Sequence, residues 1–214
     1  MSISIADMRQ DYSRQSLDVS DVLSHPIQQF EKWFNEARQS ELPEPNAMHL
    51  STVSAEGKPS GRVVLLKGIE KEAFVFYTNY QSSKGKNLAH TPWASLTFFW
   101  IELERQVRIE GSVEKVAADT STQYFHSRPR GSQIGAWVSP QSEVIADRDF
   151  LEKRKLELER QFEGKEVPRP EHWGGYAVIP QTIEFWQGRP SRLHDRIRYS
   201  KIADKGWKIE RLAP

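Results

Sequence analysis

The chain lacks cysteine, has no long apolar run and carries almost no net charge. Its 214 residues include 30 Lys and Arg against 29 Asp and Glu, which gives a formal net charge of +1. Without cysteine, a disulfide, a thiolate nucleophile and a cysteine-ligated metal are all excluded. The balanced charge argues against a general polyanion-binding role, because nucleic-acid-binding domains usually carry a large basic excess.

Other signals are missing as well. No apolar run approaches the roughly 18 residues of a membrane span, and residues 1–16 contain no apolar core of signal-peptide length. The six histidines show no metal-ligand spacing, and the chain has neither a Walker A loop nor a G-x-G-x-x-G fingerprint. We therefore expect a cytoplasmic protein that binds no nucleic acid, no membrane and no metal.

The residues that are present suit one sizeable folded domain. Apolar residues make up 37% of the chain and aromatic residues 11%, which is enough to fill a core. Residues 1–23 are polar and weakly periodic, a pattern that predicts a mobile arm or a short helix. We place a single domain over residues 24–214.

Helical periodicity is clearest over residues 24–42. The apolar stripe of this segment consists of Ile27, Phe30, Phe34 and Ala37. Ser24 stands where a residue could cap the helix. Further helices are predicted in the segments 82–92, capped by Ser82, 119–129 and 147–162.

Alternating apolar residues predict a series of strands from Ala47 onward. Two strands are expected in 47–70, one in 73–80, two in 94–116, and the last three in 174–188, 192–200 and 207–214. Short turns join most of these strands, so their pairing should be mainly antiparallel. The fold class that follows is mainly β, a barrel or sandwich with peripheral helices.

An arginine-rich segment, "RPSRLHDRIRYS", occupies residues 189–200. If residues 192–196 are extended, Arg192, His194 and Arg196 share one face of a strand. Three potential cations on one face repel one another unless an anion lies opposite. The segment is therefore either a solvated strand edge or an anion site, since guanidinium groups bind phosphate and carboxylate bidentately.

Three further segments combine cations or hydroxyls with an apolar strand or a helix end. They are "SGRVVLLKG" with Arg62 and Lys67, "YTNYQSSKGK" with Ser82, Ser83 and Lys84, and "YFHSRPRGSQIGAWVSPQS" with Tyr124, Arg128, Arg130 and Ser132. Each suits a phosphate, which hydroxyls, cations and helix N–H groups all bind. Each also has an ordinary explanation in snorkelling side chains, helix capping or arginines at a helix end. The pattern fits a phosphorylated aromatic ligand without identifying it.

These segments occur together, and in one order, with "LERQVRIEG", "WGGYAVIPQTIEFWQG", "RLHDR" and "WKIERLAP". From about Met8 to Pro214, the combination closely resembles the pyridoxamine/pyridoxine 5'-phosphate oxidase family. The resemblance implies an antiparallel, Greek-key-like split β-barrel that binds FMN, and a homodimer with FMN at the subunit interface. It also implies oxidation of pyridoxine 5'-phosphate and pyridoxamine 5'-phosphate to pyridoxal 5'-phosphate, with hydride transfer from C4' to the flavin and reduction of O2 to H2O2.

The resemblance also assigns residues to ligands. For FMN it implies Arg62, Val63, Val64, Leu65, Leu66, Lys67, Tyr77, Thr78, Ser83, Lys84, Gln106, Gln141, Ser142, Trp186 and Arg196. For the substrate it implies Lys67, Tyr124, Arg128 and Ser132 around the 5'-phosphate, Arg192 and His194 over the pyridine ring, and Arg9 to Tyr12 as a cover. We expect Arg192 and His194 to be the catalytic residues, which orient the ring and give electrostatic or proton help. Gln141 to Arg196 are expected to reach FMN from the other subunit.

One position departs from the family pattern. Ser83 stands where many members carry arginine, so one charge-assisted contact to the FMN phosphate is expected to be absent. In the arginine-rich segment, we expect Asp195 to anchor the strand and Arg189 and Arg198 to be solvated. Two alternatives stay open, namely another split-barrel flavin oxidase of the phenazine-pathway type and a non-catalytic carrier of FMN or pyridoxal phosphate.

Overall fold

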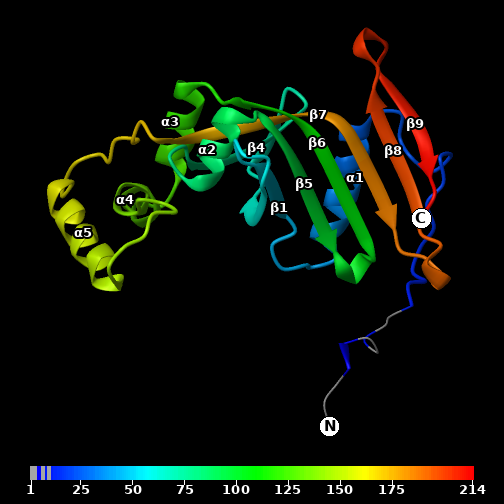
Figure 1. Cartoon of the computed structure of the whole chain (residues 1–214), viewed down its shortest axis with the longest axis horizontal. Coiled ribbons are helices and arrows are strands. Elements are labelled where there is room, and N and C mark those ends of the chain that lie inside the picture. The colour runs from blue at the N-terminus through cyan, green and yellow to red at the C-terminus, as the bar shows by residue number, and fades with distance from the viewer. Residues whose placement is uncertain (1–3, 6–7, 9–10) are drawn as a thin grey trace. The chain divides into compact units, whose positions relative to one another are not determined.

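The structure, a computed structural model, describes residues 4, 5, 8 and 11–214. Contacts divide the chain into two compact units. The first unit comprises Met1–His49, Ser95–Glu110 and Pro180–Pro214, and the second comprises Leu50–Ala94 and Gly111–Ile179. Figure 1 shows the course of the chain.

The described residues form nine strands. They are β1 (Ala47–Val53), β2 (Pro59–Leu65), β3 (Gly68–Glu70), β4 (Ala73–Asn79), β5 (Trp93–Trp100), β6 (Arg105–Lys115), β7 (Trp173–Gln187), β8 (Asp195–Lys201) and β9 (Trp207–Leu212). Hydrogen bonds place them in the order β2-β1-β5-β6-β7-β4-β3, with β8 paired to β7 and β9 paired to β8. The pairs β4–β7, β7–β8 and β8–β9 are antiparallel. This arrangement confirms the predicted mainly β fold.

Five α-helices accompany these strands in the described part of the chain. They are α1 (Pro26–Gln39), α2 (Ser83–His90), α3 (Ala118–Ser127), α4 (Arg130–Val138) and α5 (Arg148–Gln161), and short 3-10 turns occupy Ile101–Leu103, Pro190–Arg192 and Ala203–Lys205. Among the residues that the structure describes, no helix combines the length and the apolar character needed to cross a membrane.

In the first unit, α1 packs against β5 and β7 (Figure 1). The Phe30 ring lies 5.0 Å from that of Phe98 on β5, and the Trp33 ring lies 5.2 Å from that of Phe185 on β7. All four side chains are almost fully buried. Burial of each such side chain contributes about 2 kcal/mol to folding, so these rings form the centre of the unit's core.

The predicted apolar stripe of α1 needs two corrections. Trp33 is only 2% exposed, whereas Phe34 is half-buried and lies at the edge of the stripe. His25 occupies the N-cap position, but its side chain makes no capping hydrogen bond. The helix itself begins at Pro26. The predicted Ser24 cap is therefore wrong. A proline in the first turn already removes one N–H group that a cap would satisfy.

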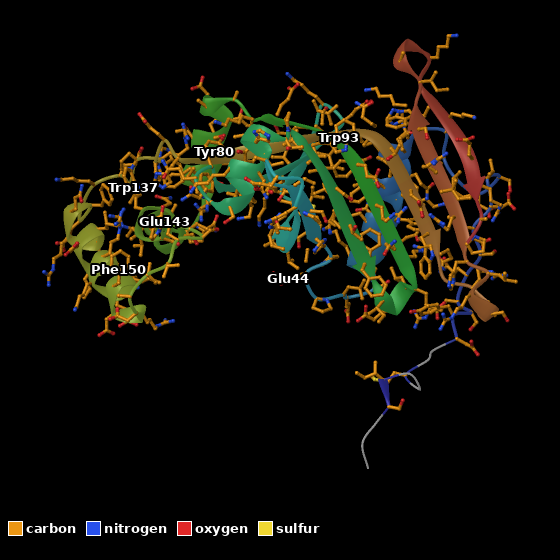
Figure 2. All side chains as sticks on the ribbon, viewed as in Figure 1. Glu44, Tyr80, Trp93, Trp137, Glu143 and Phe150 are labelled. Carbon is orange, nitrogen blue, oxygen red and sulfur yellow. The ribbon has the colours of Figure 1, made fainter. Side chains whose placement is uncertain are left out.

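In the second unit, β4 pairs with β7 over six residues, with Tyr77 opposite Gly175. A Cβ atom at Gly175 would lie 2.9 Å from the Tyr77 ring, so only glycine leaves room for that ring. Tyr80, labelled in Figure 2, follows β4 and donates from its hydroxyl to the Gly175 carbonyl at 3.2 Å. These contacts fix the end of β4, where several of the predicted ligand-binding side chains stand.

Helix α2 begins just after β4. Ser82 caps it as predicted, because its hydroxyl oxygen accepts the backbone N–H of Gly85 at 3.3 Å. A Cβ atom at Gly85 would come within 2.1 Å of the Tyr80 carbonyl oxygen. Glycine is therefore required for this approach of the helix to the strand end, and the approach positions Lys84 in the first turn.

Helices α3, α4 and α5 surround a smaller apolar cluster of the second unit. Its buried members are Phe125, Ile134, Val138, Phe162, Val167 and Trp173. Trp137 of α4, labelled in Figure 2, lies 6.0 Å from the Phe162 ring and donates from Nε1 to the Pro168 carbonyl at 2.8 Å. The sequence pattern does not predict α4, because two of its nine residues are glycines of low helix propensity.

Candidate functional site

A cavity of about 540 Å³ lies in the second unit. Eight of the residues assigned to ligands from the sequence line it: Leu65, Lys67, Tyr77, Thr78, Tyr124, Arg128, Ser132 and Gln141. They come from the end of β2, from β4, from α3 and from α4 and its flanks. The cavity therefore gathers apolar, aromatic, hydroxyl and cationic groups from four separate elements.

Stacked aromatic rings form one wall of this cavity. The Tyr77 and Tyr124 rings are 3.9 Å apart and nearly parallel, and Trp173 stacks 5.5 Å from Tyr77. Burial raises the pKa of Tyr77 to about 12. Burial also raises the pKa of Tyr124, against the opposing effect of Arg128. Both hydroxyls are therefore protonated at neutral pH and available as hydrogen-bond donors.

Arg128 places a cation beside this aromatic wall. Its guanidinium carbon lies 4.5 Å from the centre of the Trp173 ring. Its Nη1 atom is buried and has no hydrogen-bond partner among the described residues. Burial lowers the pKa of Arg128, but an arginine still keeps its charge. A buried guanidinium nitrogen without a partner calls for an acceptor in the cavity, and an anion suits it best.

Lys84 supplies a second buried cation. The side chain is 8% exposed, and its ammonium donates to Gln141 Oε1 at 3.1 Å and to Thr78 Oγ1 at 3.3 Å. Both acceptors are neutral, as is Ser82 Oγ at 3.5 Å. Burial is the main cause that lowers the pKa of Lys84, and the charge of the nearby Arg62 lowers it further. A buried cation surrounded by neutral acceptors is stabilised when an anion binds beside it.

Arg62 repeats the same pattern on β2. Its Nη1 atom donates to the Leu50 carbonyl at 3.1 Å and to Thr52 Oγ1 at 2.8 Å, and its Nη2 atom donates to Ser60 Oγ at 2.7 Å. None of these acceptors carries a charge. Arg62 and Lys84 are thus held by neutral groups and together attract an anion.

The five remaining residues assigned to FMN in the second unit do not line this cavity, and one of them, Val64, is half-buried on β2. Ser83 and Ser142 are exposed, and Ser142 has a left-handed backbone with φ 74°. Val63 is 67% exposed, whereas Leu66 is 7% exposed and belongs to the core. Gln141 was expected to act from another subunit, yet in this chain its amide oxygen accepts from both Thr78 and Lys84.

The first unit has a cavity of its own, of about 740 Å³. Tyr12, Arg192 and His194, which the resemblance assigns to the substrate, line it together with Arg189 and other residues. The His194 ring lies 4.6 Å from the Trp186 ring, and the Tyr12 ring lies 6.0 Å from His194 and 5.8 Å from Trp186. Arg9, also assigned to the substrate, lies outside the described residues.

The backbone explains how Arg192 and His194 come to this cavity. Residues 190–192 form a 3-10 turn in which Ser191 and Arg192 have φ values of 56° and 60°. The strand β8 begins only at Asp195. The expectation that Arg192, His194 and Arg196 share one strand face is therefore wrong, because left-handed residues interrupt the alternation.

His194 is held in one neutral form. Its Nδ1 atom accepts the backbone N–H of Arg189 at 3.1 Å, so the proton of the neutral ring resides on Nε2. Burial is the main cause that lowers the pKa of His194, and the charge of the nearby Arg192 lowers it further. The carboxylate of Asp195 opposes that shift. At neutral pH the ring is uncharged and donates through Nε2.

Arg196 lines a different, smaller cavity of about 170 Å³. Its Nε and Nη2 atoms bind the two carboxylate oxygens of Glu184 at 2.8 and 3.1 Å, and its Nη1 atom donates to the Ala213 carbonyl at 2.8 Å. Glu184 also accepts from Arg108 at 2.5 Å. Bonds to Glu184 raise the pKa of Arg196. The sequence gives no signal for Glu184, whose role appears only with the pairing of β7 and β8.

Two arginines expected to be solvated are paired instead. Arg189 Nε lies 3.4 Å from Asp195, and Arg198 Nη2 lies 3.2 Å from Glu210. Both partners come into reach only through the turn at 190–192 and the β8–β9 pairing. Gln106, assigned to FMN, is half-buried on β6. Within the described residues, no group of three or more metal-ligating side chains could hold a metal ion.

Comparison with protein families gives two matches. The family described as pyridoxamine 5'-phosphate oxidase matches residues 34–161. A pyridoxine 5'-phosphate oxidase C-terminal dimerisation region matches residues 173–214. The chain is 58% identical over 211 residues to a pyridoxine/pyridoxamine 5'-phosphate oxidase of Acaryochloris marina, covering 99% of this chain and 96% of the relative. It is 58% identical to the protein of the same name from Burkholderia thailandensis, covering 98% and 99%.

Solved structures share the fold. PhzG from Burkholderia lata, in complex with tetrahydrophenazine-1-carboxylic acid, superimposes with a TM-score of 0.88 at 29% identity, covering 96% of this chain and 100% of that one. A pyridoxamine 5'-phosphate oxidase-related, FMN-binding protein from Nostoc punctiforme gives 0.71 at 15% identity, covering 88% and 98%. These similarities confirm the predicted split-barrel fold.

Proposed function

The chain belongs to the pyridoxamine 5'-phosphate oxidase family, and from this we propose that it is an FMN-dependent oxidase of pyridoxine 5'-phosphate and pyridoxamine 5'-phosphate. The product is pyridoxal 5'-phosphate. The observation that carries the proposal is the set of cations in the second unit whose groups have, among the residues that the structure describes, only neutral hydrogen-bond partners or none. Two phosphorylated aromatic molecules would supply the missing anions.

The residues around Lys84 fit the FMN phosphate. Lys84 and Arg62 carry the charge, and Thr78 adds a hydroxyl at 3.3 Å from the Lys84 ammonium. The exposed Ser83 adds no cation here, so these two side chains carry the electrostatic part of FMN binding. An anion at the start of α2 also gains from the N–H groups of the first helical turn.

The residues around Arg128 fit the substrate phosphate. The buried Nη1 atom of Arg128 has no hydrogen-bond partner within residues 4, 5, 8 and 11–214, and Lys67, Tyr124 and Ser132 line the same cavity. The protonated Tyr124 hydroxyl donates a hydrogen bond, and the two cations neutralise the phosphate charge. The stacked Tyr77, Tyr124 and Trp173 rings supply apolar surface beside this grip.

The first-unit residues act on the reacting end of the substrate. Bound FMN would supply the redox chemistry, a two-electron oxidation at C4' with O2 as the final acceptor to give H2O2, and water would release ammonia from the oxidised amine. Arg192 orients the pyridine ring by its charge. His194, neutral and protonated on Nε2, donates a hydrogen bond to the ring or its substituents. Neither residue is a nucleophile.

Arg196 is proposed to contact FMN as well. Glu184 and the Ala213 carbonyl hold its guanidinium in place from behind. Trp186, next to His194, is proposed to face the flavin. We further propose a homodimer with FMN at the subunit interface, which is supported by the match of residues 173–214 to a dimerisation region.

The test is anaerobic. The protein is reconstituted with FMN, pyridoxine 5'-phosphate is added, and the absorbance of the oxidised flavin is followed. Loss of absorbance that returns when air enters, with pyridoxal 5'-phosphate formed, is the expected result. FMN that binds but is not reduced by the alcohol or the amine would overturn the proposal and favour either another flavin oxidase or a carrier.

A second candidate is a flavin oxidase of a phenazine-type substrate. It is favoured by the structural similarity to PhzG, at a TM-score of 0.88. The same anaerobic assay separates the two, because a partly reduced phenazine carboxylic acid would then reduce the flavin while pyridoxine 5'-phosphate would not. The cationic grip of Lys67 and Arg128 supports the phosphorylated substrate.

A further inference from the structure

The segment before α1 is fastened to the C-terminal strands of the first unit. Asp195 Oδ2 accepts the backbone N–H of Leu17 at 3.0 Å, and Asp195 Oδ1 accepts from Arg211 Nη1 at 2.7 Å. Arg211 Nη2 donates to the Leu17 carbonyl and to Asp18 Oδ2, both at 2.9 Å. Leu17, Asp18, Asp195 and Arg211 are called the arm clasp below. It binds backbone as well as side chains, so it fixes the course of the chain.

Asp195 also reaches the turn that carries the predicted catalytic residues. Its Oδ2 atom lies 3.4 Å from Arg189 Nε. Arg189 Nη1 in turn donates to the Gln15 carbonyl at 3.2 Å. The backbone N–H of the same Arg189 donates to His194 Nδ1. One carboxylate therefore links the arm, the turn and the strand β9.

The clasp lies a few residues from Tyr12, which forms part of the cavity wall. A Cβ atom at Gly188 would lie 2.7 Å from the Tyr12 side chain, so the arm packs tightly on the end of β7. The Tyr12 ring faces Trp186 and His194. The cavity of the first unit is thus walled by the arm on one side and by the turn with Arg192 and His194 on the other.

We propose that Asp195 is a positioning residue for the substrate site, which it serves by clasping the arm so that Tyr12 lies against His194. The inference rests on the proposed function, since it concerns the same ring-binding site. Asp195 is 17% exposed and is not among the described residues that line the cavity. Its effect passes through Leu17, Arg211 and Arg189, and not through contact with the substrate.

Replacement of one side chain on each side of the clasp tests this. Asp195→Asn removes the negative charge that Arg211 and Arg189 bind. Arg211→Gln removes the clasp contacts made from β9. The Arg211 side chain is 41% exposed, so this variant should still fold if Asp195→Asn does not. The matched control is Glu210→Gln. It removes a carboxylate that lies on the same β8–β9 pair but binds Arg198 and Lys208 instead of the clasp residues.

In the FMN-loaded enzyme, both clasp variants should raise the KM for pyridoxine 5'-phosphate about tenfold, the loss expected when a charge-assisted contact is removed. Their maximal rates of flavin reduction and their FMN affinity should stay near wild type. Trypsin should cleave them after Arg14 about tenfold faster than wild type, because the arm is released more often. Glu210→Gln should match wild type in every measurement.

Three results would overturn the inference. Unchanged trypsin cleavage and KM in both variants would show that the clasp positions nothing. An equal KM change in Glu210→Gln would assign the effect to the hairpin in general. Loss of FMN affinity in parallel with KM would indicate a purely structural role. If wild-type protein fails to oxidise the substrate, the proposed function is wrong, while the cleavage comparison still decides whether Asp195 holds the arm.

Discussion

At the scale of single residues, Arg128 contacts the Trp173 ring and has a buried nitrogen to which no residue in the described part of the chain is hydrogen-bonded. Arg128→Met keeps most of the volume and removes the charge. Loss of one charge-assisted contact costs about 1.5–3 kcal/mol, so the KM for pyridoxine 5'-phosphate should rise roughly 10- to 150-fold. FMN affinity, measured by fluorescence titration, should not change.

Arg130 supplies the matched control for this variant. Its guanidinium donates to the carbonyls of Lys165 and Phe162 at the end of α5 and does not line the cavity of the second unit. Arg130→Met should lower the thermal stability and leave KM unaltered. Equal KM values for the two variants would contradict the assignment of the substrate phosphate to Arg128.

The protonation of His194 has a predictable pH dependence. Burial and Arg192 lower the pKa of His194 below its ordinary 6.5. The folded state therefore favours the neutral ring, and this stabilising preference is complete above pH 6.5 and is lost as the pH falls through the lowered pKa. Protonation would place an N–H on Nδ1 against the Arg189 N–H and break that hydrogen bond.

An NMR titration of the His194 ring protons measures this pKa directly. The resonance is assigned by its absence in His194→Gln. We expect a midpoint below 6.5, followed at lower pH by weaker binding of pyridoxal 5'-phosphate. A midpoint above 6.5 would mean that Asp195, which opposes the shift, outweighs burial and Arg192.

Single residues of the site were largely predictable where a motif names them. Lys67, Tyr124 and Arg128 meet in one cavity, as their shared chemistry suggests. Trp173 and Glu184 were not predictable, because a tryptophan before a strand and a glutamate within one look like ordinary core and surface residues. Their neighbours come from distant segments, since Trp173 contacts Tyr77 of β4 and Glu184 binds Arg196 of β8.

At the scale of elements, α2 depends on a glycine. Gly85→Ala would place a methyl group 2.1 Å from the Tyr80 carbonyl oxygen, and backbone cannot yield as a flexible side chain would. Such overpacking costs roughly 1–3 kcal/mol. The helix start should shift, move Lys84 and weaken FMN binding, as measured by titration and by thermal unfolding.

Gly131 of α4 is the comparison, because a Cβ atom there meets nothing within 4 Å. Gly131→Ala should leave FMN binding unchanged and raise stability by up to about 1 kcal/mol, since alanine has the higher helix propensity. If Gly85→Ala behaved like Gly131→Ala, the close approach to Tyr80 would not matter for the site.

Elements with a strong period were predicted better than those that bend. The strands β4 and β7 and the helices α1 and α5 follow clear apolar patterns. The arginine-rich segment misleads, because Ser191 and Arg192 adopt left-handed backbone conformations that a sequence of non-glycine residues does not signal. Alternation therefore groups Arg196 with Arg192 and His194, whereas Arg196 lines a different cavity.

At the scale of the whole molecule, we predict that the proposed dimer buries the outer face of β5, because this face exposes a large aromatic side chain. Phe99 is 54% exposed although its neighbours Phe98 and Trp100 are buried. Phe99→Asp should shift the protein from about twice 24.8 kDa toward the monomer mass in sedimentation, and should release FMN, because a charge opposes burial at an interface.

Leu156 on α5 is 53% exposed and serves as the control. Leu156→Asp should leave both the mass and the FMN content unchanged. A Phe99→Asp protein that stays dimeric and fully loaded would move the interface away from the outer face of β5.

Fold class was the most predictable property of the whole molecule, because turn signals between short alternating segments favour an antiparallel sheet. Contacts between distant segments were the least predictable. The local sequences "QSLD" (residues 15–18) and "ERLAP" (residues 210–214) do not predict that Leu17 and Asp18 bind Arg211. This contact exists only after β8 and β9 pair.

The arm clasp has a consequence for the order of folding. It joins Leu17 to Asp195 and Asp18 to Arg211, which are 178 and 193 positions apart along the chain. Contacts of such high sequence separation form late, after the sheet that carries one side of them is assembled. The hydrogen bonds from Arg211 to Asp195 and Asp18 are also exposed to solvent, and exposed hydrogen bonds are among the first to open. On warming, the protein should therefore lose its ability to bind the substrate ring at a temperature at which the sheet is still folded and FMN is still bound.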